Sequence, residues 1–261
     1  MGDKDASEII LEGLKRLEYR GYDSAGIATL SPERFQCIKA AGKLAVLSDR
    51  LEKEDCSAPL GIGHTRWATH GLPTDENAHP HCSAEERFAL VHNGIIENAY
   101  ELRNRLESEG VLFSSETDSE VLVHLVAKWY RDSLFDAVKA ALKEVLGTYA
   151  IAVIAVDEPD TIICARKGSP LIVGLGDQET FIASDVPAIM KYTRQVLYLE
   201  DGQVCHIRRD GYTIENLEGA PQTLEVQTVE WDDKAAEKDG YAHFMLKEIF
   251  QQPQVLRNAA L

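Results

Sequence analysis

Long apolar runs and an excess of positive charge are both missing from this 261-residue chain. No apolar stretch approaches the roughly 20 residues that a membrane-spanning helix needs. The first residues, MGDKDASE, are polar where a signal peptide would be apolar. The 43 acidic and 27 basic residues give a formal charge of −16, which repels nucleic-acid phosphates and anionic membrane surfaces. The sequence therefore predicts a cytoplasmic protein with no nucleic-acid partner and no membrane partner.

Paired cysteine motifs are missing as well. The five cysteines are an odd number without CxxC spacing, which fits neither a zinc cluster nor a disulfide framework. His79, His81 and Cys82 lie close enough in sequence to suggest a metal site, but no second ligand pair at regular spacing supports one. We therefore expect no metal and no cofactor. Cys164 lies in the apolar run TIICA and fits a core residue, and none of the five cysteines has the surroundings of a nucleophile.

Helical and strand patterns follow one another in blocks, and the 44% hydrophobic content is enough for a buried core. Asp5 and Glu8 resemble a capping box, which predicts an amphipathic helix that ends before Gly21. Short strand-like runs follow at Ser24–Leu30 and Phe35–Ala41, and then a polar stretch.

The middle of the chain predicts three more helices. Apolar residues recur at helical spacing over Ile95–Leu106, over Leu122–Trp129 and over Phe135–Val145. Thr117 with Glu120 is expected to cap the second of these helices.

The sequence pattern predicts mainly strands in the second half of the chain. Tyr149–Val156 is apolar on both faces, so its strand should be covered on both sides. Further strands are expected at TIICA, PLIVGL, TFIAS, QVLYLE and QVCHI. Buried strands with segregated helices indicate an α+β architecture of stacked sheets between helical layers. We expect a domain over residues 1–229, and then a charged linker and a helical tail over 230–261 that leads toward a further domain.

The motif HTRWATHG is the densest cluster of side chains that can carry chemistry. Arg66 offers a planar fork suited to a carboxylate, Thr69 and His70 offer small polar contacts, and Trp67 can act as an apolar lid. The set suggests a pocket for an amino acid or another carboxylate. Strand capping and surface packing would explain any one of these residues alone.

Two more motifs suggest parts of a site. Asn93 and Gly94 are expected at the end of a strand just before a helix, where a backbone N–H and a side-chain amide could converge on an oxyanion. An ordinary Asn-Gly turn is the alternative. Asp118 is expected at the start of a helix, either as a cap or as a partner for a substrate ammonium group.

Several motifs taken together carry a resemblance to a known family. In chain order they are LEYRGYDSAGIA, HTRWATHG, NAHPH, VHNGIIEN, SETDSEV, GSPL, FIASD and, in the tail, KEIFQQP. This set resembles the type 2 glutamine amidotransferase, or glutaminase, domain of glutamine:fructose-6-phosphate aminotransferases, the glucosamine-6-phosphate synthases. The match covers nearly the whole chain.

The resemblance implies a four-layer αββα sandwich of the N-terminal-nucleophile hydrolase type. It also implies that glutamine is hydrolysed to glutamate and ammonia, and that the ammonia serves glucosamine 6-phosphate synthesis from fructose 6-phosphate in a separate isomerase domain. The full-length enzyme is expected to be a homo-oligomer.

The resemblance also implies roles for individual residues. Asn93 and the N–H of Gly94 would form the oxyanion hole. Arg66 would bind the α-carboxylate of glutamine and Asp118 its α-ammonium group. The remaining expected residues are Thr69 and His70 in the loop over the substrate, Trp67 between ammonia and water, Arg20 and Gly21 beside the nucleophile, and His79 and His92 as supporting residues.

The start of the sequence differs from the family pattern. Family members begin with a short apolar strand whose first residue is the nucleophilic cysteine, and here Met1 leads almost directly into the first helix. We expect that this first strand is missing from the given sequence, that an upstream start encodes it, and that the chain as given is inactive. The alternative is a non-catalytic module that binds glutamine or regulates a partner.

Overall fold

The computed structural model describes residues 1–21, 23–32, 34–67, 71–230, 240–241 and 244–259. The chain divides into two units, Met1–Val229 and Glu230–Leu261. In the second unit the described helix is α6, Phe244–Ala259. Within the described ranges, each helix is too short or too polar to span a bilayer.

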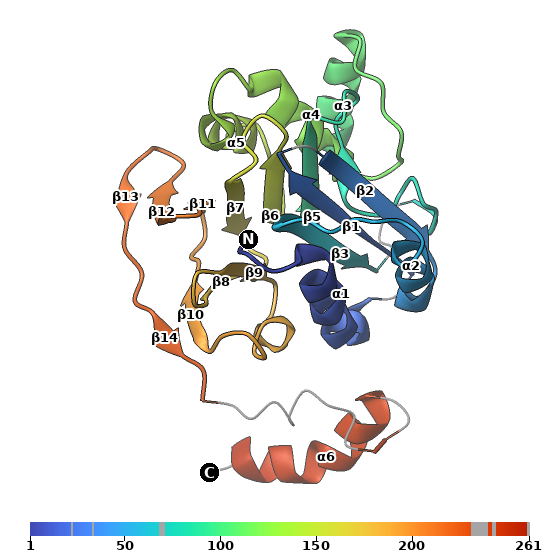
Figure 1. Cartoon of the computed structure of the whole chain (residues 1–261), viewed down its shortest axis with the longest axis vertical. Helices are drawn as coiled ribbons and strands as arrows, with labels where there is room; N and C mark the ends of the chain where they lie inside the picture. Colours follow the sequence, from blue (N-terminus) through green and yellow to red (C-terminus); the bar gives the residue numbers. More distant parts are fainter. Residues whose placement is uncertain (22, 33, 68–70, 231–239, 242–243, 260–261) are drawn as a thin grey trace. The chain divides into compact units, whose positions relative to one another are not determined.

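Three antiparallel sheets form the centre of the first unit (Figure 1). The largest has seven strands in the order β13-β12-β11-β7-β6-β5-β4, and the smaller two have the orders β2-β1-β3 and β14-β10-β8-β9. The strands of the seven-stranded sheet are β4 His81–Cys82, β5 Phe88–Ile96, β6 Gly147–Ala155, β7 Thr161–Lys167, β11 Gln203–Arg208, β12 Gly211–Asn216 and β13 Pro221–Gln222. Those of the smaller sheets are β1 Ser24–Ser31, β2 Arg34–Ala41, β3 Leu60–Arg66, β8 Ile172–Leu175, β9 Thr180–Ala183, β10 Gln195–Tyr198 and β14 Gln227–Thr228.

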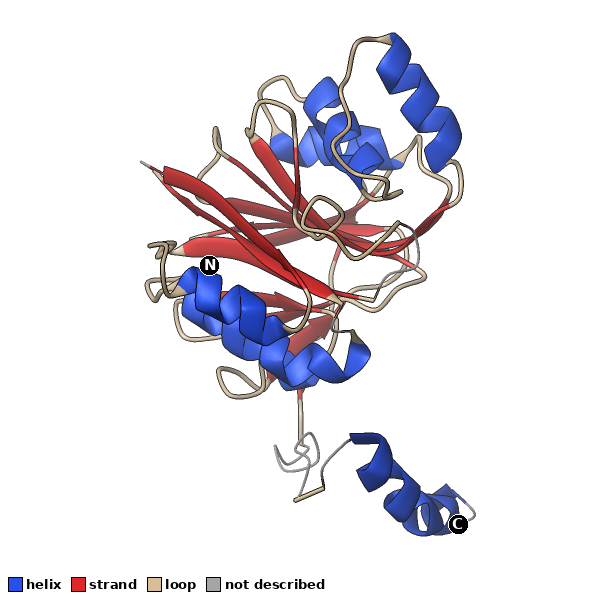
Figure 2. Cartoon of the chain, turned by 90° about the vertical axis from the view of Figure 1, so that its right-hand side faces the viewer, coloured by secondary structure: helices blue, strands red, loops and turns tan. Residues whose placement is uncertain are grey.

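Helices cover both outer sides of the stacked sheets (Figure 2). The helices of the first unit are α1 Ala6–Leu17, α2 Leu44–Leu51, α3 Ala99–Ser108, α4 Glu120–Trp129 and α5 Leu134–Leu142, with short 3-10 turns at Glu18–Arg20 and Val186–Ala188. Side chains of α3, α4 and α5 pack on one face of the seven-stranded sheet. The other face packs on both smaller sheets, and α1 and α2 cover the far side of β1 and β2. The four-layer αββα sandwich predicted from the sequence is confirmed.

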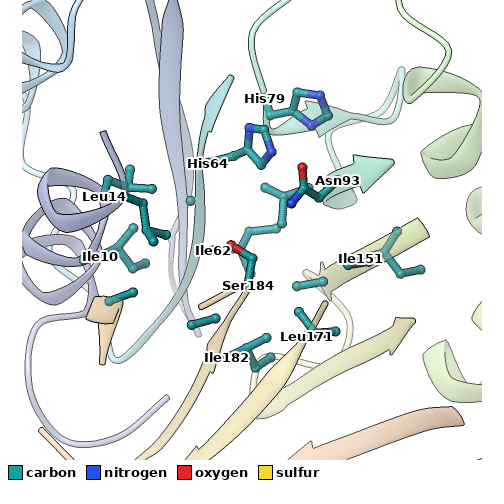
Figure 3. Close-up of a pocket in the computed structure, with 18 of the residues that line it drawn as sticks. Ile10, Leu14, Ile62, His64, His79, Asn93, Ile151, Leu171, Ile182 and Ser184 are labelled. Atoms are coloured by element: carbon teal, nitrogen blue, oxygen red, sulfur yellow. The ribbon is translucent and has the colours of Figure 1, made fainter. Parts of the chain in front are cut away.

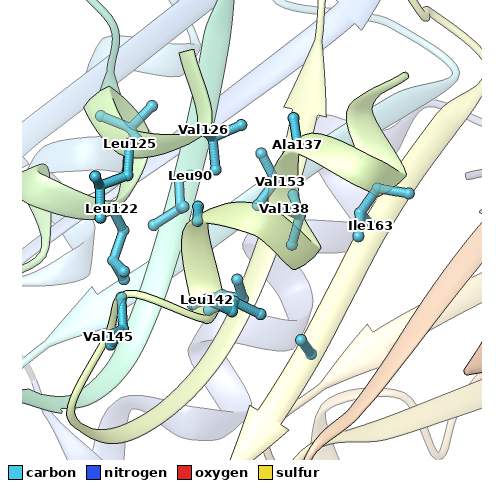
Figure 4. Close-up of a cluster of buried hydrophobic side chains, with 14 of the residues drawn as sticks. Leu90, Leu122, Leu125, Val126, Ala137, Val138, Leu142, Val145, Val153 and Ile163 are labelled. Atoms are coloured by element: carbon cyan, nitrogen blue, oxygen red, sulfur yellow. The ribbon is translucent and has the colours of Figure 1, made fainter. Parts of the chain in front are cut away.

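The side chains of strand β6 are buried alternately in two apolar layers. Tyr149, Ile151 and Val153 point into the layer beneath the helices, while Ala150 and Ile154 point into the layer between the sheets. Successive side chains of a strand point to opposite faces, so a strand covered on both sides must be apolar throughout. The expectation that this run is buried on both faces is confirmed. Figure 4 shows the layer beneath the helices, where Leu122 and Leu125 of α4 meet Leu90 of β5 and Val153 of β6.

The N-terminal helix joins distant parts of the chain. Its N-cap is Asp5, whose carboxylate accepts a hydrogen bond from the N–H of Ser7 at 2.9 Å, as the sequence predicted. From α1, Glu12 accepts hydrogen bonds from Lys191 at 2.8 Å and from Tyr192 at 2.6 Å. Thus α1 packs against a segment that lies about three quarters of the way along the chain.

Some sequence expectations are wrong at the ends of elements. Ile95 belongs to β5, because the strand continues to Ile96 before α3 begins at Ala99. Thr117 does not cap α4: the N-cap position is Ser119, and the carboxylate of Glu120 accepts the backbone N–H groups of Ser114 and Ser115 instead.

The polar stretch expected after β2 contains a helix, α2. This helix buries Leu44 and Leu47 against β1 and β2, and Leu51 packs beside them.

A large-to-small substitution should show how much the layer beneath the helices contributes to stability. Leu125 is fully buried there, so Leu125→Ala should lower the free energy of unfolding by about 2–5 kcal/mol. Leu112 is 80% exposed, and Leu112→Ala should change it by less than about 0.5 kcal/mol. Urea unfolding of the two variants measures both values. Equal losses would contradict the described packing.

Candidate active site

A cavity of about 540 Å³ lies between the seven-stranded sheet and the two smaller sheets. Its walls come from α1, β3, β5, β6, β7 and β9, and from the segment just before β8. Figure 3 shows aliphatic side chains over most of its length, among them Ile10, Ile62 and Ile182. His64 and Asn93 lie at the other end, where the lining is polar. The predicted site residues that line this cavity are Arg66, Trp67, His79, His92, Asn93, Gly94 and Asp118.

Arg66 is the last residue of β3, and its side chain is buried. The guanidinium donates to the carbonyl oxygen of Leu72 at 3.3 Å and to that of Gly71 at 3.5 Å. Burial lowers the pKa of Arg66, while the nearby carboxylates of Asp23 and Asp118 raise it. A cation held inside the protein at the edge of a cavity can bind an anionic ligand strongly.

The other predicted residues near Arg66 lie in the turn after α1 and just after β3. A Cβ atom on Gly21 would lie 2.9 Å from the backbone nitrogen of Trp67, so glycine allows the turn after α1 to pack against the Arg66–Trp67 peptide. Trp67 lies at the cavity with 60% of its surface exposed. Arg20 is the last residue of the 3-10 turn before Gly21. Thr69 and His70 lie outside the described residues.

Asn93 and Gly94 lie inside β5 and not at its end. They pair with Ala150 and Tyr149 of β6, so neither an Asn-Gly turn nor the expected position just before a helix describes them. Gly94 has φ +144°, and a Cβ atom there would come within 2.2 Å of the carbonyl oxygen of Thr148. Only glycine fits this position. The conformation leaves the side chain of Asn93 and the Gly94 peptide at the cavity wall.

Asp118 comes just before α4 and does not cap it, because Ser119 holds the N-cap position. Its Oδ2 accepts the backbone N–H of Ile96 at 2.8 Å. This bond fixes the carboxylate at the end of β5, so Asp118 and Asn93 face the same cavity although they are far apart in sequence.

Four histidines lie together beside the polar end. The rings of His64 and His79 stack with centroids 4.4 Å apart, and His81 meets His79 edge-on at 4.6 Å. The backbone N–H of His92 donates to Nδ1 of His79 at 3.3 Å, so this nitrogen of His79 carries no proton. Burial lowers the pKa of His79 well below its ordinary value, that of His81 to about 3, and that of His92. These rings are therefore neutral near pH 7.

Three residues at the polar end were not assigned a role from the sequence: His64, Ser119 and Thr148. His64 belongs to the HTRWATHG motif, so its motif could have signalled it. Thr148 reaches Gly94 only through the pairing of β5 with β6, and local sequence carries no signal for that.

The five cysteines are free thiols, and none of them lines the cavity. Cys56, Cys164 and Cys205 are buried, and Cys37 and Cys82 are half-buried. Burial raises the pKa of the Cys56 thiol, which keeps that thiol protonated. Among the described residues, no group of three or more histidine, cysteine or acidic side chains could hold a metal ion.

Met1 and Gly2 connect the edges of two sheets at the apolar end of the cavity. The backbone N of Met1 donates to the carbonyl oxygen of Thr180 and its oxygen accepts the N–H of Thr180, both at 2.9 Å. The N–H of Gly2 donates to the oxygen of Pro59 at 3.1 Å. Met1 is thus paired with β9 as an antiparallel strand would be, beside the start of β3. Both β3 and β9 are edge strands of their sheets, and both line the cavity.

Comparison with known proteins was made for sequence and for structure. Residues 64–191 match the family described as glutamine amidotransferase domain. Over 258 residues, 99% of its length, the chain is 53% identical to the glutamine–fructose-6-phosphate aminotransferase (isomerizing) of Thermus thermophilus, and it covers 42% of that protein. The corresponding enzyme of Aquifex aeolicus is 51% identical over 97% of the chain and 43% of its own length. The chain spans about two fifths of the length of these curated relatives.

A similar solved structure is the glutamine phosphoribosylpyrophosphate amidotransferase of B. subtilis, complexed with ADP and GMP. It matches with a TM-score of 0.73 and 28% identity over 83% of this chain and 48% of the other chain. The structure of an allosteric regulatory enzyme of purine biosynthesis matches with the same TM-score and 30% identity, over 83% of this chain and 47% of that one.

The buried histidines predict a loss of stability in mild acid. In the unfolded chain each histidine binds a proton below about pH 6.5, but in the folded chain the lowered pKa values of His79, His81 and His92 prevent this. Their contribution is therefore complete above pH 6.5 and is lost as the pH falls toward the folded value of about 3 for His81.

At pH 5 the expected loss is roughly 2 kcal/mol of unfolding free energy for each of His79 and His81, whose pKa values lie well below 6.5 in the folded chain. Urea unfolding at pH 7.5, 6.0 and 5.0 measures this loss. His81→Asn should reduce the fall in unfolding free energy between pH 7.5 and 5.0 by the amount that one histidine contributes. A free energy of unfolding that stays constant from pH 7.5 to 5.0 would show that the folded rings are protonated.

Proposed function

The chain belongs to the glutamine amidotransferase domain family, and on that premise we propose that its cavity binds glutamine and holds the side-chain amide for hydrolysis to glutamate and ammonia. The observation that carries the proposal is the placement of Arg66, Asp118 and Asn93 around one end of a single cavity. A free amino acid carries one carboxylate and one ammonium group, and this end offers one partner of opposite charge to each.

The two charged partners have suitable surroundings. Arg66 is buried and presents a planar fork that suits the α-carboxylate of glutamine. Asp118 has its Oδ2 held by the N–H of Ile96, and Oδ1 is the oxygen that would accept the α-ammonium group. With the α-carboxylate and the α-ammonium group held, the side-chain amide would lie beside Asn93 at the same end of the cavity.

Asn93 and Gly94 supply the chemistry at the amide. The side-chain N–H of Asn93 and the backbone N–H of Gly94 would stabilise the oxyanion that forms when the amide carbon is attacked. Trp67, which lines the cavity, would separate the released ammonia from water, and Thr69 and His70 would complete the loop over the substrate. Gly21, Arg20, His79 and His92 support this arrangement without transferring protons.

The nucleophile in this proposal is a thiol that none of the five cysteines provides, since none lines the cavity. It would belong to an extended segment that joins Met1, runs antiparallel to β9 and lies between β9 and β3. Five residues of such a strand span about 17 Å. The bonds of Met1 to Thr180 set this direction, which leads past Ile182 and Ser184 toward Asn93. A cysteine at the start of the segment could use its own α-amine as the base, because such an amine titrates near pH 8.

We propose that the ammonia is used in a part of the full-length protein that lies outside this chain. The relatives are glutamine–fructose-6-phosphate aminotransferases, and this chain spans about two fifths of their length. We therefore assign only the glutaminase step to this cavity, with fructose 6-phosphate as the acceptor elsewhere in the full protein. A module that binds glutamine without hydrolysing it is the second candidate, and the absence of a cysteine from the cavity wall favours it for the chain as given.

Glutamine binding tests the role of Arg66. The chain should bind glutamine in isothermal titration calorimetry, and Arg66→Lys should weaken binding about tenfold, because lysine keeps the charge but loses the paired hydrogen bonds. The control is Arg87→Lys, since Arg87 pairs with Asp157 on the surface. Affinity unchanged by Arg66→Lys would exclude the proposed contact with the α-carboxylate.

An assay of glutamine hydrolysis tests whether the nucleophilic thiol belongs to a segment before Met1. The chain as given should release no ammonia from glutamine above background, and a version with a five-residue extended segment that begins with cysteine before Met1 should release it. The same segment beginning with serine is the control and should stay inactive. In the active version, Asn93→Ala should lower kcat by about 10²–10³ with little change in KM. Hydrolysis by the unextended chain would place the nucleophile elsewhere.

A further inference from the structure

We infer that His92 is a positioning residue, which holds the Gly94 peptide and the Asp118 segment in one fixed relation through two hydrogen bonds of opposite direction. The inference rests on the proposed function, because it concerns how the oxyanion donors and the ammonium partner of the same site are aligned. His92 is buried on β5, directly before Asn93. Its Nδ1 lies 2.7 Å from Oγ of Ser119, and its Nε2 lies 3.3 Å from the carbonyl oxygen of Thr148.

The two partners determine which nitrogen carries the proton. A carbonyl oxygen can only accept, so Nε2 of His92 must donate to Thr148. Burial lowers the pKa of His92, and the ring is neutral near pH 7. Nδ1 is therefore unprotonated and accepts the hydroxyl hydrogen of Ser119.

This assignment has a consequence for Asp118. Oγ of Ser119 also lies 3.4 Å from Oδ1 of Asp118, but a serine hydroxyl has only one hydrogen to donate. Because that hydrogen points to His92, it does not occupy Oδ1, which is the oxygen proposed to accept the ammonium group of glutamine. Without the imidazole acceptor, the hydroxyl would turn to Asp118 and compete with the ligand.

The other side of the ring determines the position of Gly94. A Cβ atom on Gly94 would lie 2.2 Å from the carbonyl oxygen of Thr148 and 3.0 Å from Nε2 of His92. The Gly94 backbone therefore packs directly against the hydrogen bond between these two groups. Oγ1 of Thr148 also accepts the N–H of Ile95 at 3.3 Å. A shift of Thr148 would thus move the peptide whose N–H is proposed to bind the oxyanion.

Two substitutions separate the two bonds. The amide nitrogen of glutamine at position 92 can reach the place of Nε2 and donate to Thr148, so His92→Gln keeps the Gly94 side and loses the acceptor for Ser119. The amide oxygen of asparagine can reach the place of Nδ1 and accept from Ser119, so His92→Asn keeps the Asp118 side and loses the donor to Thr148.

The expected effects are opposite. In calorimetry on the chain as given, His92→Gln should weaken glutamine binding about tenfold, and His92→Asn should bind as the unchanged chain does. In the version extended with a cysteine-bearing segment, His92→Asn should lower kcat at least tenfold with KM nearly unchanged, and His92→Gln should raise KM with kcat nearly unchanged. Equal changes in both constants for both variants would overturn the inference, because a merely structural histidine would give that result.

A matched control and an independent measurement complete the test. His124 is another buried histidine, on α4, where it pairs with Glu120 at 3.5 Å and packs on Phe113. His124→Gln should reduce stability without changing glutamine affinity.

Nitrogen-15 NMR of the His92 ring at pH 7 should show a protonated Nε2 and a bare Nδ1, and Ser119→Ala should shift the Nδ1 signal. A proton on Nδ1 would overturn the inference. If the unchanged chain fails to bind glutamine, the proposed function fails, and the NMR measurement still decides the state of His92.

Discussion

Phe88–Ile96 pairs residue for residue with Gly147–Ala155, and the rest of the first unit is arranged around this antiparallel pair of strands. One face of the pair carries the apolar layer under α3, α4 and α5, and the other carries the layer between the sheets. A shift of the pairing by one residue would exchange the side chains that the two faces present to their layers, and both layers would have to repack. The same register brings Thr148 beside Gly94 and Ile95, so the core and the geometry of the site depend on one constraint.

The site is polar and yet lies at the end of an apolar cavity inside the protein. Charged and polar groups in such a place must be paired or neutral, because burial without a partner costs several kcal/mol. The structure meets this requirement in two ways. Asp118 and Arg66 bind backbone groups, and the histidines around them are held neutral by burial. The positions of the charged groups are thus fixed before any ligand arrives, which favours tight and specific binding.

Local patterns in the sequence predicted the elements whose residues are covered by one clear apolar face. The first helix with its Asp5 cap and the doubly covered strand from Gly147 are examples, and the layered α+β class followed from their order. The helix at Leu44–Leu51 was missed because its two buried leucines make only a short apolar face among polar residues. Ile95 was assigned to a helix because its spacing from Ala99 fits a helix by chance, whereas pairing with Thr148 holds it in a strand.

Most of the candidate site residues could be listed from motifs, but the partners of His92 could not. Ser119 and Thr148 lie 27 and 56 residues from His92 and meet its ring only after the strands pair and α4 docks. Contacts of this kind depend on tertiary register, which local sequence does not encode. The resemblance to a family supplied candidate roles, while the directions of the hydrogen bonds required atomic positions.

The contact of α1 with the segment around Lys191 also bears on how the protein assembles during synthesis. Glu12 and its partner Lys191 are 179 residues apart, so the first helix leaves the ribosome long before its docking surface exists. At about 5–20 residues per second, Ile9 and Leu17, the apolar residues of α1 that pack near this segment, are made on the order of ten seconds or more before it. Contacts between residues so far apart in sequence slow folding, because the entropy cost of closing the loop comes before the contacts stabilise the fold. The docking of α1 on this segment therefore cannot be completed until most of the first unit has been synthesised.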